Sequence, residues 1–150
     1  MELDVIFVCH GNVNRSRVAE ELFRKLRPDL RIDSFAVGCK SVGGKLMTKK
    51  MRSLLDSENI PYNINSRSKV LTKNVIENTS HIFVMDDNNI KHFKIRFGDF
   101  GLNKLSKLSN LIGEKSIKDP GFSKGIDDFI TAYLKIEQCC KILAIEYEEL

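Results

Sequence analysis

A cysteine and an arginine stand close together near the N-terminus, in the segment CHGNVNR that runs from Cys9 to Arg15. The apolar run at residues 5–8 predicts a buried strand before this segment, and apolar residues at helical spacing predict a helix from about Ser16. We therefore expect a strand-to-helix loop whose amides converge on an anion. A helix N-terminus and a guanidinium both favour thiolate over thiol, so Cys9 is a candidate nucleophile beside a phosphate site.

The other loop residues have types that suit this chemistry. Arg15 offers a planar fork that can hold two phosphate oxygens, which a lysine could not imitate. Gly11 lets the backbone approach the anion, and Asn12 tolerates the positive φ that a tight anion-binding loop requires. Ser16 has two compatible interpretations, as the N-cap of the helix or as a hydroxyl that hydrogen-bonds the Cys9 thiolate.

Strands and helices alternate along the rest of the chain. We expect strands at residues 31–37 and 81–85, helices at 16–28, 46–55 and 72–78, a helix or turn from 86, mostly loop with one short helix at 97–118, and a closing helix from 127. This pattern predicts one domain over residues 1–150, a three-layer α/β/α sandwich around a central, mainly four-stranded parallel sheet. Ligands of such sheets bind beyond the carboxyl ends of the strands, where the loop after the first strand lies.

The composition narrows the class of protein. The net charge of +4 is spread along the chain, which predicts no nucleic-acid partner but suits an anionic substrate. The sequence has no membrane-spanning apolar stretch and opens with acids rather than a signal peptide, so we expect no membrane association and a cytoplasmic location. Its cysteines and histidines show no metal-binding spacing, which predicts reduced thiols and no metal.

Residues 8–17, VCHGNVNRSR, resemble the motif V-C-x-G-N-x-C-R-S-P of the low-molecular-weight protein tyrosine phosphatases. Far downstream, Lys118-Asp119-Pro120 resembles the Asp-Pro acid loop of that family, and weaker similarity extends over essentially the full chain. Taken alone, Asp119-Pro120 would be interpreted as an ordinary turn. Together with the loop, and in the order the family uses, Asp119 is the better candidate for a catalytic acid.

Carried over to this sequence, the family mechanism makes Cys9 the nucleophile that forms a phosphocysteine, Arg15 the phosphate clamp, and Asp119 the acid and then the base. The resemblance implies metal-independent hydrolysis of phosphotyrosine in a protein or peptide, release of inorganic phosphate and no cofactor. It leaves the oligomeric state unknown. The residues expected to surround the substrate are His10, Gly11, Asn12, Val13, Asn14, Ser16 and Phe122.

Two departures from the family pattern change what can be carried over. Asn14 stands in the position of the second loop cysteine, so a disulfide that protects Cys9 within the loop should not form. Gly121 and Phe122 replace the aromatic pair that commonly follows Asp-Pro. Phe122 is then either the remaining aromatic wall of the cleft or a core residue.

Other functions are compatible with the same loop. Protein arginine phosphatases of this family carry threonine where Val13 stands, and valine lacks that hydroxyl, which favours phosphotyrosine. Arsenate reductases of similar architecture use two further central cysteines, and residues 68–100 contain none. A non-catalytic phosphate-binding or adaptor module is the alternative from a different class; the presence of Cys9, Arg15 and Asp119 argues against it.

Overall fold

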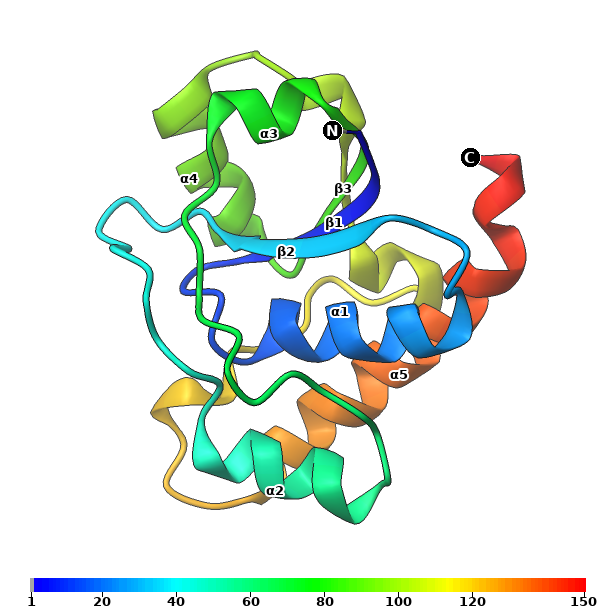
Figure 1. Cartoon of the computed structure of the whole chain (residues 1–150). Helices are drawn as coiled ribbons and strands as arrows, with labels where there is room; N and C mark the ends of the chain where they lie inside the picture. The colour runs from blue at the N-terminus through cyan, green and yellow to red at the C-terminus, as the bar shows by residue number, and fades with distance from the viewer. Residues whose placement is uncertain (1) are drawn as a thin grey trace.

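The structure is a computed structural model that describes residues 2–150, apart from the side chain of Phe122. One sheet of four parallel strands, in the order β2-β1-β3-β4, forms the centre of the molecule (Figure 1). The strands are β1 (Leu3–Cys9), β2 (Ile32–Ala36), β3 (Thr79–Val84) and β4 (Leu105–Lys107). The predicted four-stranded parallel sheet is therefore confirmed.

Helices cover both faces of this sheet (Figure 1). None of the helices in residues 2–150 is long and apolar enough to cross a membrane. They are α1 (Arg15–Leu26), α2 (Lys49–Ser57), α3 (Lys73–Glu77), α4 (Asp87–Phe97) and α5 (Asp127–Glu146), with short 3-10 turns η1 (Leu102–Lys104), η2 (Leu108–Ile112), η3 (Pro120–Phe122) and η4 (Tyr147–Glu149).

The alternation of side chains along β1 separates the core into two layers. Val5 and Phe7 pack with residues of α1, α2 and α5, whereas Ile6 and Val8 pack with residues of α3 and α4 on the other face. All four side chains are fully buried, as expected for a central parallel strand covered on both sides. The three-layer α/β/α sandwich that the sequence predicts is the observed architecture.

The central position of β1 determines where its loop emerges. Cys9 is in register with Ala36 of β2, and the preceding Val8 is in register with Val84 of β3. The loop after β1 therefore leaves the sheet between the carboxyl ends of two neighbouring strands, with the segments that follow β2 and β3 on either side of it.

The fourth strand lies where the sequence predicted mostly loop. Residues 97–118 contain β4 as well as the turns η1 and η2, so the prediction for this segment was wrong in part. The strand has only three residues, and it exists because Leu105, Ser106 and Lys107 pair with β3. Such a short strand carries no alternating apolar pattern of its own, since its conformation is imposed by the neighbouring strand.

Candidate active site

Cys9 is the last residue of β1, and its side chain is almost fully buried at the base of the loop. Its Sγ lies 3.1 Å from the hydroxyl oxygen of Ser16. Helix α1 begins at Arg15 with Asn14 as its N-cap, so Ser16 belongs to the first helical turn. Of the two interpretations of Ser16, the N-cap is therefore wrong, and its hydroxyl instead faces the cysteine sulfur.

Asn12 fixes the shape of the loop from beneath. Its φ of 54° is in the left-handed region, as the sequence predicts for this position. Its fully buried amide nitrogen donates to the hydroxyls of Ser16 at 2.7 Å and of Ser34 at 2.9 Å. Its amide oxygen accepts from the backbone N–H of Lys69 at 2.9 Å. Asn12 thus ties the loop to α1, β2 and the segment before α3.

All the hydrogen bonds of the Arg15 guanidinium to described residues are made by Nη1. Nη1 donates to Asp86 Oδ2 at 2.7 Å and to the carbonyl oxygen of Ile117 at 2.8 Å, and the side chain is 2% exposed. Within the described part of the chain, Nε and Nη2 make no hydrogen bond. The edge formed by these two nitrogens is the one that can hold two oxygens of a phosphate.

Asp86 is a residue of the site that was not among the site residues expected from the sequence. It does cap α4, because its Oδ1 accepts from the N–H of Asn89 at 2.8 Å, but its other oxygen binds Arg15. Its position two residues after the end of β3 was the signal that could have found it, since side chains at the carboxyl ends of neighbouring parallel strands converge.

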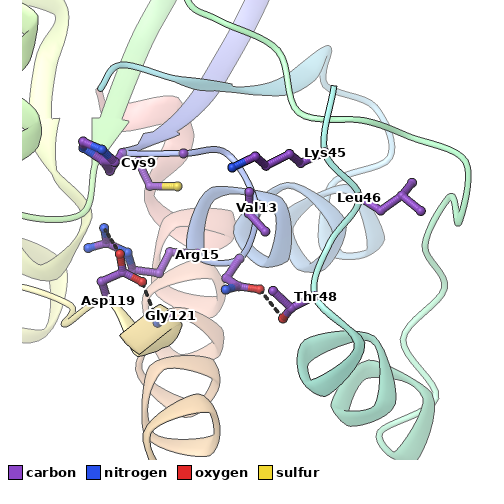
Figure 2. Close-up of a pocket in the computed structure, with 11 residues that line it drawn as sticks. Cys9, Val13, Arg15, Lys45, Leu46, Thr48, Asp119 and Gly121 are labelled. Carbon is purple, nitrogen blue, oxygen red and sulfur yellow. Dashed lines mark hydrogen bonds and ion pairs between the residues drawn. The ribbon is translucent and has the colours of Figure 1, made fainter. Parts of the chain in front are cut away.

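Asp119 reaches the same site from the opposite end of the sequence. It caps the short turn η3, where its Oδ1 accepts from the N–H of Gly121 at 2.8 Å. Its Oδ2 lies 3.8 Å from Nη2 of Arg15, and the side chain is 36% exposed. Asp119 is therefore a turn residue and also a wall of the cavity above Cys9 (Figure 2).

A cavity of about 430 Å³ opens above the loop. Its lining includes Cys9, Arg15 and Asp119, together with the expected residues His10, Gly11, Val13 and Asn14. It also includes Lys45, Leu46 and Thr48, which sequence reasoning missed (Figure 2). Asn12 and Ser16 do not line this cavity; they support it from behind. The expected role of the Phe122 side chain lies outside the described residues.

Thr48 connects the loop to α2. Its hydroxyl donates to Asn14 Oδ1 at 2.7 Å (Figure 2). The same hydroxyl accepts, more weakly, from the N–H of Met51 at 3.4 Å. Asn14 is 6% exposed, so its amide is held within the protein rather than by solvent. The position expected to carry a cysteine in the family thus carries a structural hydrogen bond to the next helix.

Comparison with known proteins agrees with this geometry. A low molecular weight phosphotyrosine protein phosphatase of Sus scrofa is 31% identical over 148 residues, which cover 91% of this chain and 90% of the relative. The tyrosine phosphatase Wzb from Escherichia coli K30, solved with sulphate, superposes with a TM-score of 0.87 at 21% identity and covers 98% of this chain and 99% of its own. The YwlE arginine phosphatase from Geobacillus stearothermophilus superposes with a TM-score of 0.85 at 23% identity over 98% of this chain and 94% of its own.

These two solved structures support the fold, whereas the sequence matches identify the family. Residues 4–150 match the family described as low molecular weight phosphotyrosine protein phosphatase. The resemblance predicted from the loop and from Asp119 is thereby confirmed. The chain belongs to the low molecular weight phosphotyrosine protein phosphatase family, a family of hydrolases.

Proposed function

We propose that this chain, as one catalytic domain, hydrolyses phosphotyrosine in proteins through a phosphocysteine intermediate. The observation that carries the proposal is the meeting of three groups around one cavity: Cys9, the Nε and Nη2 edge of Arg15, which makes no hydrogen bond to described residues, and Asp119. Phosphoryl transfer requires a nucleophile, donors for the equatorial oxygens and a proton for the leaving group, and these three side chains supply them.

In the first step, the Cys9 thiolate attacks phosphorus through its Sγ while the bond from phosphorus to the tyrosine oxygen breaks. Asp119 donates its proton to that oxygen, so the leaving group departs as neutral phenol. Arg15 and the loop amides, including those of Gly11 and Val13, neutralise the charge on the equatorial oxygens.

In the second step, Asp119 takes a proton from water as the water oxygen attacks phosphorus. The bond from sulfur to phosphorus breaks, and inorganic phosphate and the Cys9 thiolate are released. The Ser16 hydroxyl, 3.1 Å from the sulfur, is positioned to donate a hydrogen bond to that thiolate. Asn12 holds Ser16 in place through its own hydrogen bond at 2.7 Å.

Val13 favours phosphotyrosine over phosphoarginine as the substrate. It lines the cavity with an apolar side chain, which can pack against a phenyl ring but cannot hydrogen-bond a guanidinium. The likeness to an arginine phosphatase concerns the fold, so it does not outweigh this chemistry.

The experiment is a comparison of hydrolysis rates for phosphotyrosine, phosphoserine and phosphoarginine peptides of matched sequence. We expect phosphotyrosine to be hydrolysed fastest and Cys9→Ser to reduce turnover to background, because a serine hydroxyl ionises far less readily than a thiol and is the weaker nucleophile. A faster rate with phosphoarginine would favour the alternative substrate. Full activity in Cys9→Ser would exclude the phosphocysteine mechanism.

A further inference from the structure

The rim of the cavity carries a cation that the proposed chemistry does not use. Lys45 lines the cavity beside Leu46, and Figure 2 shows its side chain running along the mouth with the ammonium directed toward Cys9. Among the residues that the structure describes, the ammonium has no hydrogen-bond acceptor and no carboxylate partner. A cation in this position is available to a group on the substrate.

The backbone of Lys45 is fixed, although its side chain is exposed. Its N–H donates to the Ser68 hydroxyl at 2.8 Å, and its carbonyl oxygen accepts from the N–H of Ser68 at 2.7 Å. The neighbouring Gly44 donates a third hydrogen bond, to the carbonyl oxygen of Ser68 at 2.8 Å, and Ser68 itself is buried. Lys45 is therefore presented at the mouth by an anchored segment rather than by a free loop.

The charges around the mouth are distributed unequally. Asp119 stands on the other side of Cys9 from Lys45 (Figure 2). Because Cys9 and Arg15 at the floor are 3% and 2% exposed, a bound phosphotyrosine must descend from a peptide that crosses the rim. An acidic side chain beside the phosphotyrosine would be attracted by the ammonium of Lys45.

We propose that Lys45 is a specificity-determining residue that selects phosphotyrosine peptides with an acidic residue next to the phosphotyrosine. The inference rests on the proposed function and adds a substrate class to it. Since the ammonium is exposed, the preference should be modest, about two- to fivefold for glutamate over glutamine, and it should weaken at high salt.

The test uses three phosphotyrosine peptides that differ only in the two flanking residues, which are glutamate, glutamine or lysine. The ratio of kcat/KM values among the peptides is measured for the wild type, Lys45→Gln, Lys45→Glu and a matched control, Lys49→Gln. Lys49 is also an exposed lysine, but it does not line the cavity. We expect Lys45→Gln to abolish the preference, Lys45→Glu to reverse it, and Lys49→Gln to retain it.

The inference is overturned if the wild type shows no preference, if Lys45→Gln keeps it, or if Lys49→Gln loses it to the same extent. Binding of the same peptides to Cys9→Ser, measured by calorimetry, separates this inference from the proposed function. If no peptide is turned over but binding depends on flanking charge only when Lys45 is present, the proposed activity fails and the role of Lys45 stands. If turnover is normal and independent of flanking charge, the role of Lys45 fails and the proposed activity stands.

Discussion

The floor and the rim of the cavity differ in how their side chains are held. At the floor, Asn12 and Arg15 are buried and make several hydrogen bonds to groups from distant parts of the chain. At the rim, the ammonium of Lys45 has no partner among the described residues, and the carboxylate of Asp119 accepts one hydrogen bond from its own turn and lies 3.8 Å from Nη2 of Arg15. The comparison indicates that the phosphate position is fixed by the fold, whereas contacts to the leaving group and its neighbours are open to change.

Replacing Arg15 by lysine tests the floor and should have the largest effect. Lysine keeps the positive charge but loses the fork and the fixed contact to Asp86, so we expect kcat/KM to fall by about 10²- to 10³-fold. The rates are measured with p-nitrophenyl phosphate, and thermal unfolding shows whether the variant folds. A loss of less than tenfold in a folded variant would mean that charge, rather than geometry, is what the floor supplies.

Replacing Asp119 by asparagine tests the rim and should depend on the leaving group. We expect kcat to fall by about 10²-fold with phosphotyrosine and by much less with p-nitrophenyl phosphate, whose leaving group needs little protonation. Asp127→Asn is the matched control, because Asp127 is also acidic but lies in the first turn of α5 outside the cavity. An equal loss for both substrates would deny Asp119 the role of proton donor.

Asn12 allows the backbone and the side-chain contributions at the floor to be separated. Asn12→Gly keeps access to the φ of 54° but removes the hydrogen bonds of the amide. Asn12→Ala removes both, so we expect it to lower the free energy of unfolding by about 2 kcal/mol or more, and by more than Asn12→Gly does. Chemical denaturation measures both values; an Ala variant as stable as the Gly variant would show that the backbone conformation costs nothing.

Thr48 lies between floor and rim, and its removal should have a smaller effect. Thr48→Val removes the hydrogen bond to Asn14 and the cap of α2, which should cost about 1 kcal/mol of stability. Thr48→Ser retains the hydroxyl and should keep both hydrogen bonds, the one to Asn14 and the one from Met51. Denaturation and kcat/KM are compared for the two variants, and a Ser variant as impaired as the Val variant would assign the effect to the lost methyl group.

The thiols of α5 provide a reference for a buried cysteine that has no role at the site. Burial raises the pKa of Cys139 to about 11, and burial also raises the pKa of Cys140 above its ordinary value. In the unfolded chain these thiols ionise at a lower pH than in the folded protein. Their contribution to the free energy of unfolding is therefore fully present below the pKa of the unfolded thiols, and it is lost as the pH rises toward about 11, the pKa of Cys139 in the folded protein. Denaturation between neutral and alkaline pH should show this decline, and it should be reduced in a variant with alanine at both positions.

The floor could be predicted from the sequence because its parts are local. The apolar run before Cys9, the Gly-Asn pair and Arg15 follow one another within one strand-to-helix connection, where local spacing determines the geometry. Asp119 could be identified through the family resemblance only, since local pattern alone indicated a turn.

The rim could not be predicted in the same way. Lys45 is held at the cavity by a hydrogen bond to Ser68, and Thr48 by a hydrogen bond to Asn14. Each bond joins two segments that are far apart in the sequence, and no local pattern of residues predicts that they meet. Strand β4 was missed for a related reason, since its three residues adopt their conformation by pairing with β3. Tertiary contacts thus decide the elements whose own sequences are ambiguous.

The hydrogen bonds of the Thr48 hydroxyl link the catalytic loop to the first turn of α2. Opening of the first turn of this helix would release the Met51 amide and the Asn14 side chain at the same time, because both are bound to one hydroxyl. Hydrogen exchange at the Met51 amide therefore reports indirectly on the order of the loop. Asn14, which stands where the family has its second loop cysteine, therefore couples the order of the catalytic loop to local unfolding of α2.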